Sequence, residues 1–356
     1  MSVTRTSLIA SAAVALCLGL AAPVAAQSLG ATAKIEPGGL YEIAFNPADS
    51  TLLVAATGPR GETRGSVAHL KADLTPLALI DVSKTPVYGL GFNAKTQVLY
   101  GTVTRTGSVL ALDARTGKVI AEIKDGDDDS AHVREVIVDE QRNKAYVTTV
   151  GGQAGDTSRP NLVWVIDGAT NTIERKIKTP VGVLTGAALD VAGNRLFVTG
   201  MGSQDIGVID LAKGDAAVAW PTGSKEPANV AYDAAGKRLF VASQGSGDLT
   251  VMSSVDGKVI RQVATGKGAL SVAYDGGLDR VYVANRGEGT VTVVNGKDYA
   301  VLANLATGTM PQTIAIDRKT HLVYVTNKAK GLPRNAPAGT PVPEDPTGDT
   351  VTIIKP

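Results

Sequence analysis

Three histidines, His69, His132 and His321, are the side chains of this 356-residue chain best suited to metal binding or proton transfer. They lie in different parts of the chain, and none has a second histidine at the HxH or HxxxH spacing of a metal site. We therefore predict no metal and no cofactor. The histidines are interpreted as structural or solvent-exposed, and His132 is of most interest because it precedes a predicted inner strand.

Other patterns resemble functional motifs only locally. The pairs Gly245/Gly247 and Gly287/Gly289 have no predicted helix after them, so we interpret them as hairpin glycines rather than a phosphate cradle. The acidic run 125–129 could offer oxygen ligands to Ca²⁺, but it lacks the twelve-residue loop with a terminal Glu, and we expect a solvated loop. No GxSxG motif occurs. With no catalytic constellation in view, we predict that the protein is not an enzyme.

A repeated unit must position whatever residues carry function. Its anchor residues follow one another at intervals of 42 to 51 residues, a period typical of a propeller or a solenoid. The anchors are Phe45, Phe92, Val138, Leu189, Tyr232, Tyr274 and Ile316. Each unit contains four short predicted strands, joined by turns rich in Asn, Asp and Gly. Asp113, Asp167 and Asp210 recur after third strands and are interpreted as turn residues rather than catalytic acids.

Two features favour a closed propeller over a solenoid. The residue before the anchor is small in six of the seven units, as expected where innermost strands crowd around an axis. The seventh unit stops after its third strand, and residues 31–37 resemble a fourth strand. We predict an all-β, seven-bladed β-propeller of four-stranded antiparallel blades, closed by this N-terminal strand in the last blade.

The N-terminus has the pattern of an export signal. Arg5 precedes an apolar run from Leu8 to Ala22, and small residues precede Gln27, so we assign residues 1–26 to a signal peptide and residues 27–356 to the propeller domain. Cys17 is the only cysteine, and Leu16 before it argues against a lipid anchor. Removing residues 1–26 leaves 34 basic and 34 acidic residues, so bulk charge predicts no polyanion partner. We expect a periplasmic monomer without a membrane anchor.

The repeats also carry a family resemblance. Tyr324-Val325-Thr326-Asn327, the segment 281–285, Asp210 and the Thr-Gly linkers resemble the YVTN-repeat β-propellers of bacterial envelopes, over roughly residues 31–356. The resemblance implies the same propeller fold and an envelope location. It also adds single-stranded DNA as a partner, which composition alone does not suggest, and an envelope protein is a further possible partner.

The loops after second strands and the linkers between blades should open on one face, and the long insertions lie there. We expect Arg60, Arg105, Arg134, Arg286 and Lys328 on this face, where an anionic ligand or single-stranded DNA would bind. A small polar ligand would meet Glu42 and Glu135, which point inward, with Tyr41 and Tyr88 at the channel entrance. A salt-bridged, solvated rim is the alternative.

Function remains a choice between classes. We favour a non-catalytic binding or scaffold protein. The alternative is a propeller enzyme, lactonase-like, or a subunit of a periplasmic redox complex, which would need convergent acid, base or metal ligands.

Overall fold

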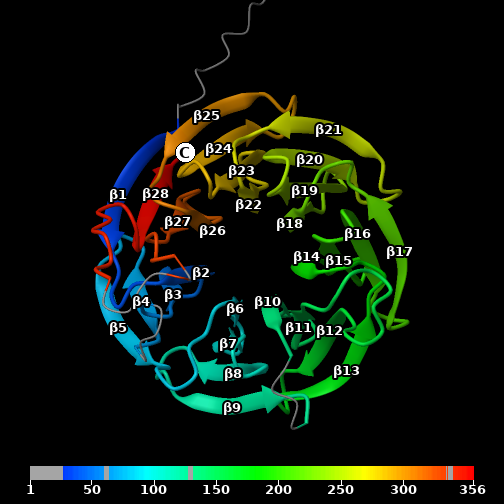
Figure 1. Ribbon diagram of the computed structural model, residues 1–356, viewed down its shortest axis with the longest axis horizontal. Coiled ribbons are helices and arrows are strands. Elements are labelled where there is room, and N and C mark those ends of the chain that lie inside the picture. Colours follow the sequence, from blue (N-terminus) through cyan, green and yellow to red (C-terminus); the bar gives the residue numbers. More distant parts are fainter. Residues whose placement is uncertain (1–26, 60–63, 127–130, 334, 336–339) are drawn as a thin grey trace, which may run out of the picture.

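The computed structural model describes residues 27–59, 64–126, 131–333, 335 and 340–356. These residues form seven four-stranded antiparallel sheets that surround a central axis like the blades of a propeller (Figure 1). The predicted fold class is therefore confirmed. Among the described residues, no helix is present that could cross a membrane. The expected signal peptide, Arg60 and three aspartates of the acidic run lie outside the described residues.

The innermost strands of the blades are β2 (Leu40–Asn46), β6 (Leu90–Asn93), β10 (Val133–Asp139), β14 (Leu184–Asp190), β18 (Pro227–Asp233), β22 (Ala269–Asp275) and β26 (Pro311–Ile316). The second strands are β3 (Thr51–Ala56), β7 (Val98–Val103), β11 (Lys144–Thr149), β15 (Arg195–Gly200), β19 (Arg238–Ser243), β23 (Arg280–Asn285) and β27 (Val323–Asn327). The third strands are β4 (Ser66–Lys71), β8 (Ser108–Asp113), β12 (Leu162–Asp167), β16 (Asp205–Asp210), β20 (Asp248–Ser253), β24 (Thr290–Asn295) and β28 (Thr350–Lys355). The outermost strands are β5 (Pro76–Asp81), β9 (Val119–Lys124), β13 (Thr172–Lys178), β17 (Asp215–Pro221), β21 (Val259–Ala264), β25 (Val301–Ala306) and β1 (Ser28–Lys34).

The hydrophobic core is divided among the spaces between neighbouring blades. One apolar cluster joins Phe240 of the fifth blade to Val281 of the sixth, and equivalent clusters lie between the other pairs of blades. The second strands supply much of this core because they are covered on both faces, which explains their apolar, β-branched sequences. Crowding near the axis also explains a glycine: a Cβ at Gly91 would lie 2.6 Å from Val136 Cγ1.

The N-terminal strand closes the ring as predicted, with shifted bounds. Strand β1 covers Ser28–Lys34 rather than 31–37, and it pairs antiparallel with β28 as the outermost strand of the seventh blade (Figure 1). The seventh blade thus takes its third strand, β28, from the C-terminal end of the chain and its fourth strand, β1, from the N-terminal end. This pairing covers the edge that β28 would otherwise expose.

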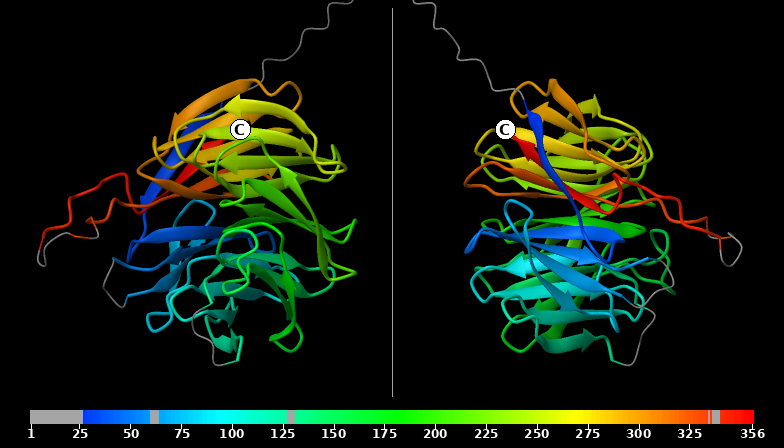
Figure 2. Two further views of the ribbon diagram at one scale, coloured as in Figure 1. Left: turned by 45° about the vertical axis from the view of Figure 1, so that its right-hand side comes forward. Right: turned by 90° about the vertical axis from the view of Figure 1, so that its left-hand side faces the viewer.

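The two faces of the propeller differ in what they carry. We call the face with the loops after second strands and the linkers between blades the mouth face, and the opposite face the turn face. The described residues between β27 and β28 project from the body of the propeller (Figure 2). On the turn face, a buried Asn or Asp ends most inner strands and accepts N–H bonds from the following turn, as Asp233 does from Ala235 and Gly236. Asp113, Asp167 and Asp210 accept equivalent bonds, so their interpretation as turn residues is confirmed.

Candidate functional site

A cavity of about 550 Å³ lies on the propeller axis. This axial cavity is lined from the inner strands and from the loops that follow second strands. Its lining residues are Tyr41, Glu42, Tyr88, Gly89, Thr104, Arg105, His132, Arg134, Glu135, Met201, Ala228, Asn229, Gln244, Leu270, Ser271, Arg286, Gln312 and Thr313. The volume falls within the range of small-molecule sites.

Irregular pairing places two consecutive residues at the cavity. In β2 and β10 the register with the second strand shifts near the start, and the two residues within each shift face the axis. These are Tyr41 and Glu42 in the first blade, and Arg134 and Glu135 in the third. A β-bulge of this kind commonly re-aims side chains at the rim of a barrel or beside a site.

The strand register also orders the charged residues by depth. Pro311 pairs with Asn327 and Ala269 with Asn285, so Lys328 and Arg286, which follow these second strands, lie at the mouth face. Arg105 follows β7 in the same way. We call Arg105, Arg286 and Lys328 the rim cations. Glu42 and Glu135 are each the third residue of an inner strand that starts at this face, so these deep acids lie below the rim.

The deep acids are only partly buried by surface area, but the surface that they expose faces the cavity rather than the outside of the protein. Protein on all sides therefore removes much of their hydration. Burial and then repulsion from Glu135 raise the pKa of Glu42 well above its usual value. Burial also raises the pKa of Glu135 to about 7, although Arg134 acts in the opposite direction. Both shifts favour the protonated carboxyl forms, so the deep acids offset the arginines less than fully ionised carboxylates would.

Two tyrosines support the rim cations. The rings of Tyr41 and Tyr88 meet edge to face, with centroids 4.8 Å apart. Lys328 Nζ lies 3.5 Å from the Tyr41 ring centroid, and the Arg105 guanidinium lies 5.9 Å from that of Tyr88. Burial, followed by repulsion from Arg286, lowers the pKa of Lys328 to about 8. The rim cations therefore form an arc around the mouth.

Arg134 and Arg286 have few partners for their charge. Burial lowers the pKa of Arg134, while Glu135 and Glu42 raise it and Arg286 lowers it. The Arg286 Nε atom is buried without a hydrogen-bond partner in the described part of the protein. Arg286 also borders a second cavity of about 350 Å³ beside Lys330 and Thr347. A buried guanidinium nitrogen without a hydrogen-bond partner is costly, and a bound anion would satisfy it.

The structure brings together most of the residues that the sequence suggested. Tyr41, Glu42, Tyr88, Arg105, Arg134, Glu135 and Arg286 line the axial cavity. Lys328 lies over Tyr41 at its edge, and Arg60 is outside the described residues. His132 also lines the cavity, whereas His69 contacts Thr51 and His321 pairs with Asp275, as expected of structural histidines.

The neutral wall of the cavity was missed by the sequence interpretation. Met201, Ala228, Asn229, Gln244 and Leu270 come from the fourth to sixth blades. Asn229 occupies the same place in its repeat as Glu42 and Glu135, three residues before the anchor. Repeat position was therefore the signal that could have found these residues.

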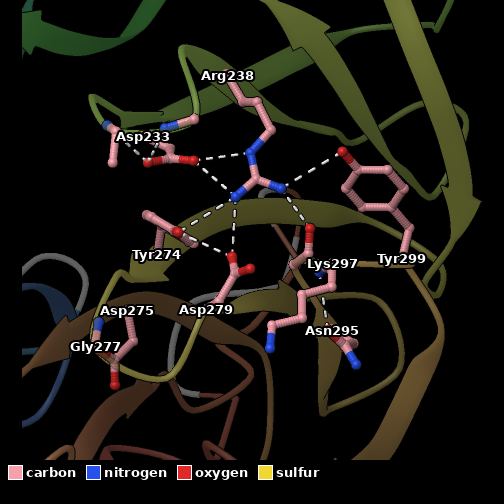
Figure 3. Close-up of polar contacts among 12 residues, drawn as sticks. Asp233, Arg238, Tyr274, Asp275, Gly277, Asp279, Asn295, Lys297 and Tyr299 are labelled. Atoms are coloured by element: carbon pink, nitrogen blue, oxygen red, sulfur yellow. Dashed lines mark hydrogen bonds and ion pairs between the residues drawn. The ribbon is translucent and has the colours of Figure 1, made fainter.

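A second arginine site lies on the turn face (Figure 3). Arg238 forms ion pairs with Asp233 at 2.7 Å and with Asp279 at 2.9 Å, and donates a hydrogen bond to the carbonyl of Gly296. The hydroxyl oxygens of Tyr274 and Tyr299 accept bonds from the same guanidinium. This Arg238 cluster joins the fifth and sixth blades. The ion pair between Arg195 and Asp190 repeats part of this arrangement one blade earlier.

The fold and the cavity define a class, a seven-bladed β-propeller with a charged axial site on one face. No known family model matches the chain. The protein YncE of Escherichia coli (strain K12), whose name records no function, is 27% identical over 182 residues, 49% of this chain and 49% of that protein. The YncE protein of Salmonella typhi is 29% identical over 182 residues, with the same coverage. The chain thus spans about half the length of the curated relatives it matches. Together with the seven blades, these similarities fit a YncE-like propeller family.

Proposed function

We propose that this protein is a non-catalytic binding protein that holds an anionic ligand in the axial cavity. The observation that carries the proposal is the convergence of Arg105, Arg134 and Arg286 on one cavity, where Arg286 Nε has no hydrogen-bond partner among the residues that the structure describes. Because burial raises the pKa of both deep acids, their negative charge is reduced near neutral pH, and the arginines dominate the field in the cavity. The periplasm, reached through a signal peptide in residues 1–26, is the location we propose for this binding.

Single-stranded DNA is one anionic partner that the mouth face would accept. The rim cations would contact phosphates there, while Lys328 and Arg105 lie against the tyrosine faces on which bases would otherwise stack. This arrangement favours a small anion within the cavity over a strand that stacks across it.

An acid–base enzyme that uses the same cavity is a second candidate. One observation favours it, since a carboxyl group with a pKa of about 7 suits general acid–base catalysis near neutral pH. Hydrolysis of a panel of lactones should be absent in the wild-type protein. Turnover that Glu135→Gln abolishes would replace the binding proposal with an enzymatic one.

The binding proposal is tested by titration calorimetry with inorganic phosphate and with a twelve-residue thymidine oligonucleotide. The triple variant Arg105→Ser/Arg286→Ser/Lys328→Ser should lose binding of both, with its melting temperature nearly unchanged. A control variant, Lys124→Ser/Lys258→Ser/Arg261→Ser, removes three exposed cations far from the axis and should bind as the wild type does. If the oligonucleotide contacts three rim cations, log K against log salt should have a slope of roughly −2. Equal binding by the rim and control variants, or no binding by the wild type, would overturn the proposal.

A further inference from the structure

The deep acids are unexpected in a cavity that binds an anion. Glu42 and Glu135 occupy the same repeat position in the first and third blades, and the other blades have Gly89, Gly186, Asn229, Ser271 and Thr313 there. Neutral residues therefore fit this position. Two carboxyl groups below the rim cations weaken binding of a simple anion. Their presence therefore indicates a ligand that is not a simple anion.

The deep acids also have spare acceptor capacity. Neither takes part in any ion pair within 4.0 Å among the described residues. Against the effect of burial, polar groups of Ile43 and Thr313 act to lower the pKa of Glu42, and the Thr313 hydroxyl donates to the carbonyl of Tyr41. The charged group that acts on both deep acids is Arg134, from the same strand as Glu135, and Arg286 at the rim acts in turn on Arg134. The carboxyl groups remain close enough to repel each other. Such a pair is stabilised either by a proton or by a cation placed between them.

The charges of the rim cations and the deep acids, and their order by depth in the cavity, together indicate what the ligand must carry. Resting on the proposed function, we infer that the ligand is a small zwitterion whose acidic group contacts the rim cations and whose ammonium group binds between Glu42 and Glu135. The neutral wall formed by Met201, Ala228 and Leu270 would contact the chain that joins the two groups. Amino acids with a terminal amine and short peptides are the chemical class that has this arrangement.

Proton release distinguishes a zwitterion from a simple anion. An ammonium group that enters between the deep acids replaces the proton held there, and that proton passes to the buffer. A simple anion has the opposite effect, because added negative charge favours protonation of the same carboxyl groups. Arg134 and Thr313 act on the deep acids in both cases, so the sign of proton exchange reports on the ligand's ammonium group.

The test compares glycine, 4-aminobutyrate and 6-aminohexanoate with acetate, butyrate and hexanoate by titration calorimetry at pH 7, in two buffers of different ionisation enthalpy. At least one zwitterion should bind tenfold or more tightly than its amine-free counterpart and should release protons. The variant Glu42→Gln/Glu135→Gln should lose this preference and retain or improve binding of the carboxylate. The control Glu122→Gln/Glu174→Gln, on the outer strands β9 and β13, should behave as the wild type.

The outcomes separate the two proposals. If the amine-free anions bind at the rim cations and no zwitterion binds more tightly, the zwitterion inference is overturned and the anion-binding function stands. If a zwitterion preference survives the Glu42→Gln/Glu135→Gln change, the deep acids are not its ammonium site. If neither series binds, both proposals fail.

Discussion

The Arg238 cluster on the turn face and the cations at the mouth face are both positively charged sites, but their charges are balanced differently. Arg238 has two aspartates and several oxygen acceptors around it. Its pKa rises well above the ordinary value, because these hydrogen bonds and charges outweigh the effect of burial. Burial instead lowers the pKa of Arg134 and of Lys328 on the other side. The charge of Arg238 is thus balanced by contacts within the protein, whereas the cations at the mouth face are available to a ligand in the cavity.

This difference teaches how a repeat fold separates stability from binding. The turn face joins one blade to the next through contacts such as Arg238 with Asp279 and His321 with Asp275. Its polar groups therefore stabilise the fold. The mouth face tolerates poorly balanced charges near the axis. Proteins commonly lose some stability at sites of function, and the rim cations fit that pattern.

The largest expected effect is on folding. Arg238→Ala should lower the free energy of unfolding by about 3 kcal/mol, because it leaves the buried Asp233 without its cation. Equilibrium unfolding in urea measures the change. Arg195→Ala, at the equivalent place one blade earlier, should cost less, because Arg195 pairs with one aspartate rather than two. A loss for Arg238→Ala no larger than that for Arg286→Ala would remove the distinction between the two sites.

The reciprocal change should affect binding. Arg286→Ala should weaken binding of phosphate about tenfold or more, the expected effect of losing one charge-assisted hydrogen bond. Its unfolding free energy should stay close to that of the wild type, since Arg286 Nε has no hydrogen-bond partner to lose among the described residues. Calorimetry and urea unfolding of the same preparation make the comparison. Unchanged phosphate affinity together with reduced stability would show that Arg286 serves the fold, as Arg238 does.

A smaller effect should appear in the pH dependence of stability. The pKa of each deep acid is raised in the folded state, so folding favours their protonated forms. Their contribution to stability is therefore greatest at low pH, and it is lost as pH rises from the unfolded value near 4.5 through about 7. The Glu42→Gln/Glu135→Gln variant should gain stability relative to the wild type between pH 5 and pH 8. A difference that stays constant or shrinks over this range would contradict the assignment.

The smallest expected effect is on one lysine. The pKa of Lys328, about 8 in the free protein, should rise when phosphate binds, because a nearby anion favours the charged amine. NMR of protein with ¹³C-labelled lysine side chains measures this titration. Lys258 serves as an exposed control whose pKa is raised by its partner Asp256, and phosphate should leave it unchanged. Equal shifts at both lysines would indicate a general ionic effect rather than binding at the mouth.

Much of the fold was predictable because one pattern recurs seven times. The apolar second strands, the hairpin turns and the N-terminal closing strand all followed from comparing repeats, and β1 differed only in its bounds. The depth order of the charges was harder to predict, because it depends on bulges that turn Glu42 and Glu135 toward the axis.

The network around Arg238 could not be predicted in the same way. Its contacts join different blades, and Asp279 and Gly296 are distant from Arg238 in sequence. The raised pKa values of the deep acids are likewise products of the closed ring, since each acid comes from a different blade. Sequence alone shows the charge of such residues but not which charges meet.

The most direct test of the central claim is to locate an anion in the protein. Crystals soaked in selenate should show an anomalous scattering peak in the axial cavity, with selenate oxygens at about 3 Å from the guanidinium nitrogens of Arg286 and Arg105 or Arg134. The Arg238 cluster should show no peak, because its charge is already paired. Selenate at the Arg238 cluster or on the outer surface, with none in the axial cavity, would contradict the account.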